Sequence, residues 1–158
     1  MTTKNQEQEA IELSPIEFER YQEMATQELI NLQQKVDPES ANTTALYPYG
    51  ATFAMAAAFF SLKLSSVTPI AFTNGVNLTF LGEGGGGIVG GGLYAGAGTF
   101  SVDPATLPSK EVKFAISGSP SSVSIVWTYN NRPIGFFIGN GLSPFAGSGG
   151  GTGRFTRL

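Results

Sequence analysis

A glycine-rich pattern occurs twice in the chain, about 55 residues apart, and it restricts the fold more than any other feature. The first copy reads GGGLYAGAGTF and ends at Phe100, and the second reads GSGGGTGRF and ends at Phe155. Two further pairs keep nearly the same offset, Asn74 with Asn130 and Gly82 with Gly139. Glycine permits the sharp coiling and the close backbone approach that a small barrel needs. The pattern therefore predicts a duplicated β unit.

The residue types after position 45 favour strands, because Val, Ile, Phe and Thr recur there with a period of two. We predict a mainly β fold: a closed eight-stranded antiparallel barrel of two similar four-stranded, Greek-key-like halves, preceded by one amphipathic α-helix. The expected strands span roughly 57–65, 67–73, 76–82 and 93–102, then 110–117, 122–129, 133–138 and 152–157. Asn74-Gly75 predicts a two-residue hairpin turn with positive φ at both residues, and Asn130-Asn131 a weaker version of it.

The N-terminal region has a different character from the rest, because it is acidic and has helical rather than strand periodicity. Residues 1–13 are predicted to be disordered, 14–37 to form the helix, 38–45 to link it, and 46–158 to form the barrel domain. Ser14 can cap the helix, Pro15 suits its first position, and Glu17 completes a capping box. Asp37-Pro38 ends it.

One face of the predicted helix is apolar, with residues spaced on average 3.6 apart: Phe18, Tyr21, Ala25, Leu29, Leu32 and Val36. This face either packs on the chain's own barrel or binds a protein partner, for which the candidates are Phe18, Tyr21, Leu29 and Leu32. The opposite face carries four glutamates, which disfavours docking of the helix on an anionic membrane. Membrane association of the protein as a whole stays open.

The composition excludes several kinds of chemistry. The chain has no histidine and no cysteine, which removes thiol nucleophiles, Ser-His triads and nearly every zinc site. We expect no enzyme activity, no catalytic residues, no metal, no cofactor and no small-molecule substrate. Gly82, Gly84 and Gly87 match a G-x-G-x-x-G pattern, but a phosphate site would need a helix directly afterwards. Six Lys and Arg residues in the barrel region are too few for a nucleic-acid surface.

Two functions fit a small barrel of this kind. An eight-stranded barrel has room inside for side chains or for one small ligand. The many Phe, Leu and Ile residues at alternate positions favour a filled interior, and hence an interaction protein that acts through its surface. The alternative is a barrel that binds a small apolar ligand, as lipocalins and avidin do.

The segments VSIVWTYNNRPIGFFIGNG and GSGGGTGRF, together with the glycine runs that precede G-x-G-x-aromatic, resemble the virulence-associated (Vap) proteins of intracellular actinobacterial pathogens. The resemblance extends from about Ala45 to the end of the chain. It implies a compact, filled eight-stranded barrel and a non-enzymatic, effector-like role on host endolysosomal compartments. It also implies an exported or host-directed protein, although the polar N-terminus lacks the apolar middle of a secretory signal.

Overall fold

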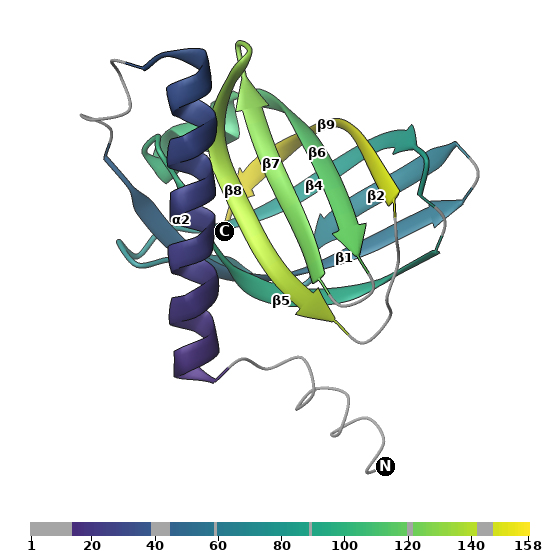
Figure 1. Cartoon of the computed structure of the whole chain (residues 1–158), viewed down its shortest axis with the longest axis horizontal. Helices are drawn as coiled ribbons and strands as arrows, with labels where there is room; N and C mark the ends of the chain where they lie inside the picture. Colours follow the sequence, from purple (N-terminus) through teal and green to yellow (C-terminus); the bar gives the residue numbers. More distant parts are fainter. Residues whose placement is uncertain (1–13, 39–44, 59, 89, 120–121, 142–146) are drawn as a thin grey trace.

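A computed structural model describes residues 14–38, 45–58, 60–88, 90–119, 122–141 and 147–158 (Figure 1). A β-barrel makes up most of these residues, and a single long helix lies along its outer wall. This arrangement confirms the predicted fold class. The disorder predicted for residues 1–13 and most of the predicted linker fall outside the described residues.

The helix, α2 (Pro15–Val36), begins and ends where the capping signals place it. The backbone N–H of Glu17 donates to the Ser14 hydroxyl at 3.2 Å, and the Glu17 carboxylate accepts from the Ser14 backbone N–H at 3.4 Å. These two bonds satisfy donors that the first turn leaves without helical partners. At the other end, the N–H of Asp37 donates to the Gln33 carbonyl at 2.8 Å.

The strands follow the helix in sequence. The first half contains β1 (Tyr47–Ala58), β2 (Ser61–Ser66), β3 (Ile70–Phe72), β4 (Asn77–Gly86) and β5 (Gly90–Phe100). A short 3-10 helix, η2 (Pro104–Ser109), connects the halves. The second half contains β6 (Glu111–Ser119), β7 (Ser122–Tyr129), β8 (Arg132–Gly141) and β9 (Gly147–Arg157).

The sheet closes with eight strand positions, because β2 and β3 are two pieces of one interrupted strand. Both pieces lie between β1 and β4 and pair with each of them. Around the barrel the order is β1, β2 with β3, β4, β9, β6, β7, β8 and β5, and β5 pairs again with β1. All of these pairings are antiparallel.

The two halves have the same strand order. In the first half, β5 returns to pair with β1, and in the second β9 returns to pair with β6. A fourth strand that lies beside the first is the Greek-key order. The pairs that share an offset in the sequence also fall on equivalent strands: Gly82 with Gly139 on β4 and β8, and Phe100 with Phe155 on β5 and β9.

The predicted bounds of the first strands are wrong. The expected strand at 57–65 runs across the hairpin between β1 and β2, and most of β1 was not predicted at all. The number eight was nevertheless right, because the prediction counted the regions of β2 and β3 as two strands. The alanine-rich stretch of β1 leads into a hairpin that has no Gly, Asn, Asp or Pro at its tip, so no turn signal marks the boundary.

The two predicted asparagine turns differ from expectation. Asn130 and Asn131 both have positive φ, 52° and 64°, as a two-residue type I′ turn requires. In the other hairpin Gly75 alone has positive φ, at 94°, and the Asn74 side chain accepts a hydrogen bond from the N–H of Val76 at 3.2 Å. Asn130-Asn131, the weaker of the two sequence signals, therefore forms the regular two-residue turn. In the Asn74-Gly75 hairpin, the Asn74 side chain instead binds the backbone two residues further on.

Aromatic rings fill the barrel, and glycines on neighbouring strands make room for them. The largest fully buried side chains are Trp127, Tyr49, Phe53, Phe80, Phe100, Phe137 and Phe155. Their rings contact one another at centroid distances from 4.8 to 6.5 Å. A Cβ built on Gly82 would lie 2.7 Å from the Phe114 ring, and one on Gly153 would lie 2.5 Å from the Phe80 ring. Glycine and phenylalanine are thus used together to pack the interior.

Tyr49 is the polar member of this core, and it gives the fold a pH dependence. Its hydroxyl donates to the Phe136 carbonyl at 3.0 Å, and complete burial raises the pKa of Tyr49 well above its ordinary value of 10.0. Above pH 10 the unfolded chain releases this proton while the folded chain keeps it, so stability falls as pH rises. We expect Tyr49→Phe to flatten this fall, measured by urea unfolding at pH values from 8 to about 11. An unchanged slope would show that other groups cause the alkaline loss.

Candidate functional site

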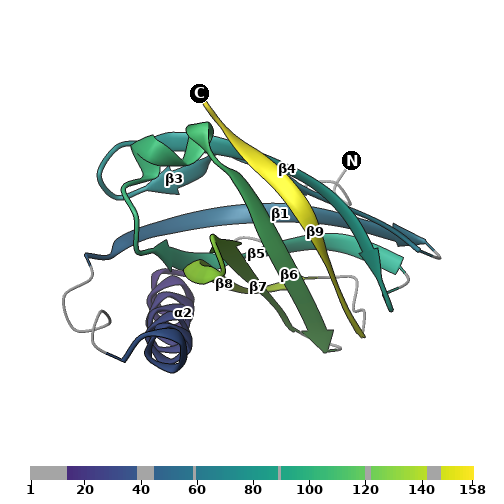
Figure 2. The same ribbon diagram turned by 90° about the horizontal axis from the view of Figure 1, so that it is seen from above.

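The helix lies on the outside of the barrel, across β5 and β8 (Figure 2). Ala25 and Leu29 are fully buried there, against Phe136 and Ile138 of β8. Because Phe137 points into the barrel, its neighbours on either side point outward. Strand β8 is therefore buried on both faces, and this explains its continuous apolar run, PIGFFIG.

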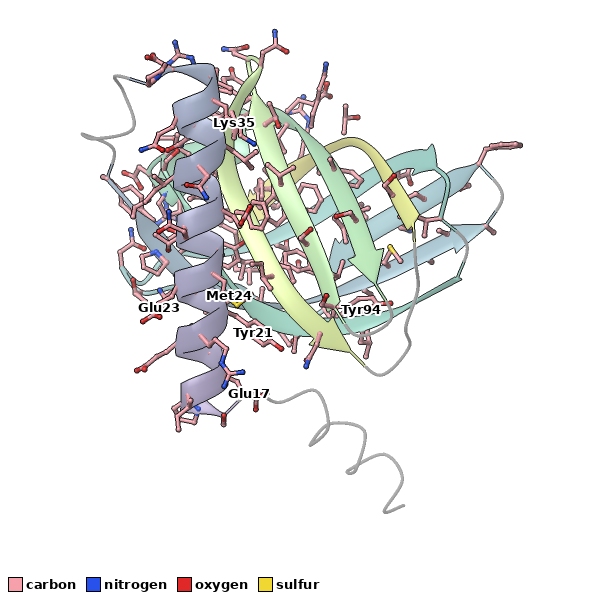
Figure 3. All side chains as sticks on the ribbon, in the orientation of Figure 1. Glu17, Tyr21, Glu23, Met24, Lys35 and Tyr94 are labelled. Atoms are coloured by element: carbon pink, nitrogen blue, oxygen red, sulfur yellow. The ribbon has the colours of Figure 1, made fainter. Side chains whose placement is uncertain are left out.

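Small residues on the barrel let the first turns of the helix approach closely. A Cβ on Gly50 of β1 would lie 3.3 Å from the Phe18 Cζ atom and closer still to Cε2, so the ring lies directly on the glycine. Tyr21 is also on the barrel-facing side, where it packs against the cluster that contains Ala25 and Leu29, whereas Glu23 points away (Figure 3). Partial burial, followed by the nearby Glu17 carboxylate, raises the pKa of Tyr21.

Polar contacts hold the last turns of the helix at the start of β8. The Gln33 side chain donates to the Ser101 hydroxyl at 2.7 Å and to the Pro133 carbonyl at 3.1 Å. Asp37 forms an exposed ion pair with Arg132 at 3.8 Å. The hydrogen bonds fix the helix along its length, whereas an exposed ion pair contributes little.

The structure places all four predicted partner-binding residues on the barrel side of the helix. Leu29 is fully buried and Tyr21 and Leu32 are partly buried in one cluster, while Phe18 lies apart from them on β1. The apolar face thus packs on this chain's own barrel, which was one of the two interpretations of the pattern. Binding of a protein partner through the helix stays a prediction.

A groove runs beside the helix, over the outer face of β6, β7 and β8. Its larger part has a volume of about 540 Å³, and a second hollow continues it toward the start of β9. The helix forms one wall, and outward-facing side chains of the strands form the floor. The lining residues that matter for its chemistry are Met24, Gln27, Glu28, Ser117, Ser124, Phe136 and Ile138.

The groove combines an apolar floor with hydroxyl groups. Ser117 and Ser124, which face each other across β6 and β7, share a hydrogen bond of 2.9 Å between their hydroxyls. Among the described residues that line the two hollows, Glu28 alone is charged. The sequence did not point to these residues as a site. Serines alternate there on strands that are otherwise rich in Val and Ile. This pattern is common on solvent-exposed strand faces, so it does not mark a site.

The acidic residues of the barrel region do not come together. Glu83 lies on β4, the Asp103 carboxylate accepts from the Ala105 N–H at the start of η2, and Glu111 pairs with Arg154 at 3.8 Å. Within the described ranges, no group of three or more His, Cys, Asp or Glu residues could hold a metal ion. The glycine run of β4 leads into strand β5 rather than a helix. It therefore lacks the helix N-terminus of a nucleotide site.

Leu29 gives a direct test of how firmly the helix is docked. We expect Leu29→Ser to lower the free energy of helix opening by about 2–4 kcal/mol, since it removes a fully buried leucine. Amide hydrogen exchange in α2 should then accelerate roughly a hundredfold or more. Glu23→Ala, on the exposed side of the helix, is the matched control and should change exchange little. Equal exchange in both variants would contradict the docking.

These features define a small, filled β-barrel protein with a helix docked on its outer wall. A family model described as Rhodococcus equi virulence-associated protein matches residues 6–156, and the chain belongs to this family. The match includes the helix as well as the barrel. Of the helices in the described part of the chain, none has the length and apolar character needed to cross a membrane.

Two solved structures share the fold. The virulence-associated protein VapD of Rhodococcus equi aligns with a TM-score of 0.62 and 19% identity, over 70% of this chain and 98% of that one. VapB of the same organism aligns with a TM-score of 0.59 and 20% identity, over 72% of this chain and 100% of that one. No curated protein matches the sequence significantly. At such identities the two structures establish a common fold and do not establish a common function.

Proposed function

We propose that this protein is a non-enzymatic, effector-like virulence factor that acts through its outer surface on host endolysosomal compartments. The observation that carries the proposal is the packed aromatic interior. Trp127 lies at its centre, in contact with five other aromatic rings. A filled interior leaves little room for a ligand inside the barrel, which supports interactions through its outer surface.

The composition and the placement of the carboxylates support the same view. The chain contains neither histidine nor cysteine, and the carboxylates of the barrel region lie on separate elements. The tyrosine whose pKa burial raises most is Tyr49, which is enclosed in the core and cannot reach a substrate. General acid-base catalysis needs a titratable group within hydrogen-bond reach of the substrate.

Delivery of purified protein to macrophage endolysosomes tests the proposal. We expect degradative capacity, followed with a quenched protease substrate, to fall in proportion to the protein taken up. The effect should stop growing once uptake stops, because a binder acts by occupancy. Heat-denatured protein is the control. An effect that keeps increasing after uptake ends would indicate enzymatic turnover. No effect at all would contradict the proposed action on endolysosomes.

The ligand-binding alternative makes a different prediction. A lipocalin-like barrel would hold one small apolar molecule inside its walls. We expect native mass spectrometry of the purified protein to give the mass of the chain alone, because buried aromatic side chains fill the interior and protein interiors are close-packed. An apolar ligand at near-unit occupancy would favour the alternative.

A further inference from the structure

The end of the barrel that carries the β1–β2 hairpin has an unusual exposed residue, Phe60. Its side chain is 91% exposed. The Phe60 backbone lies against β4, because a Cβ on Gly85 would overlap the Phe60 carbonyl oxygen. The Phe60 carbonyl therefore lies against β4, and the Phe60 ring points into solvent.

Further exposed apolar residues lie on the strands that lead up to this ring. Ala56 and Ala58 are exposed on β1, and Leu93, opposite Ala54 in the β1–β5 register, is 38% exposed. Glycines 90 to 92 continue the β5 side of the same surface without side chains. We call these residues, Ala56, Ala58, Phe60 and Leu93, the hairpin patch. Exposed apolar surface that includes an aromatic ring is unfavourable in water and often marks an interaction site.

Few charged side chains lie at this end of the barrel. The first ones met on its strands are Lys63 of β2, which lies opposite Ala56 at the border of the hairpin patch, and Glu83 of β4, which lies opposite Lys63. Closer to the tip, the described parts of 52–62, 84–98, 115–126 and 137–151 carry no charge. The opposite end differs, with Arg132, Asp103, Lys110, Glu111 and Arg157 at or near its strand ends. One end of the barrel is therefore neutral.

The helix does not change this asymmetry. Glu28 approaches the barrel beside Ser117 and Gly118, at the hairpin between β6 and β7. That hairpin lies four strand positions from β1 and β2 in a barrel of eight, which is the opposite side. Figure 2 shows the strand tips on the right, with the helix and η2 at the left. The first turn of the helix does lie over β1, at Gly50, but Gly50 is near the start of that strand, whereas Ala56, Ala58 and Phe60 lie at and beyond its far end.

We infer that the hairpin patch docks on the surface of a lipid bilayer, with the Phe60 ring in the interfacial region. A neutral surface suits a lipid interface, where a charge would be costly to desolvate and an aromatic ring is favoured. A specific protein interface would be expected to add charged or hydrogen-bonding groups for orientation. This inference deepens the proposed function, on which it rests for its setting, by naming the surface that meets a compartment membrane.

The absence of cysteine makes a direct experiment possible, since one introduced cysteine is labelled uniquely. The full chain carries Phe60→Cys labelled with the environment-sensitive dye NBD, and vesicles of pure phosphatidylcholine are added. We expect NBD emission to increase several-fold and shift to the blue. Ala105→Cys, exposed on η2 at the opposite end, is the control and should not respond. No response at residue 60 would overturn the inference.

Sedimentation of unlabelled protein with the same vesicles gives the energetic test. We expect Phe60→Ser to weaken binding about tenfold, because the ring leaves the interface. Val67→Ser is matched to it, since Val67 is also an exposed apolar residue, 53% exposed, but it lies beside Thr52, midway along β1 and away from the hairpin patch. Circular dichroism spectra should show both variants folded. An equal loss in both would overturn the proposed site.

Salt and lipid charge distinguish the inference from electrostatic docking. Contact through a neutral patch should persist from 50 mM to 500 mM NaCl, whereas attraction between charges is screened. Binding that needs anionic lipid and disappears at high salt would overturn the inference. The vesicle experiments use no cells, so they can fail while the macrophage effect stands. Likewise, vesicle binding without any effect in macrophages would contradict the proposed function alone.

Discussion

Replacing Gly98 with alanine is expected to cost at least about 3 kcal/mol of stability or to prevent folding. Gly98 on β5 lies opposite Tyr49 on β1 and opposite Phe137 on β8. The rings of these two neighbours stack over it, 6.4 Å apart and inclined by 15°. An added methyl group would overlap the Tyr49 ring and also the Phe136 carbonyl oxygen. No change of rotamer relieves an overlap with backbone, so the barrel must distort.

The measurement is urea unfolding followed by far-ultraviolet circular dichroism. Gly87→Ala is the matched control, because the nearest atom to a Cβ there is the Ser148 carbonyl oxygen at 3.9 Å. This control should stay within about 0.5 kcal/mol of the wild type. If Gly98→Ala is as stable as Gly87→Ala, close packing of rings over glycine is not what holds the interior together.

Truncating the central ring, with Trp127→Ala, is expected to remove about 3–5 kcal/mol, the usual cost of the cavity left by a buried aromatic side chain. Trp127 is fully buried and contacts five aromatic rings from four other strands. The loss is a large part of the roughly 5–15 kcal/mol that stabilises a typical domain. Neighbouring rings cannot collapse into the space, because the closed sheet fixes their positions.

Trp127→Phe separates ring volume from polarity. The indole N–H is buried without a hydrogen-bond partner among the described residues, which costs free energy in the wild type. Phenylalanine removes this donor and keeps part of the ring, so this variant should lose less than half of what alanine loses. Circular dichroism is again the readout, since the chain has no other tryptophan for fluorescence. Equal losses would mean that the ring itself contributes little.

Local signals were sufficient for some elements of the fold. The capping box at Ser14 and the 3.6-residue period predicted the helix, and both are local properties of the sequence. Strand β7 was also predicted at its observed bounds, because alternation and the Asn130-Asn131 turn mark its limits. In these segments, local preference and tertiary structure agree.

The hairpin between β1 and β2 could not be predicted, because its tip has no turn residue and exposes a phenylalanine. Burial patterns assume that a large apolar residue faces the core, and Phe60 does the reverse. Such a departure is most often found where a surface has a use. The outward burial of Phe136 and Ile138 could not be predicted for a related reason. These residues pack on a helix about a hundred residues earlier in the chain, and the pattern of a strand does not show such a partner.

The position of β9 has a consequence for the nascent chain. This strand, formed by the last residues described, inserts between β4 and β6. Until it has left the ribosome, the other strands can form at most an open sheet whose two free edges are β4 and β6. Unpaired edges attract other strands and promote aggregation. During synthesis the protein therefore depends on late closure, and a chaperone that covers β4 and β6 would protect it until then.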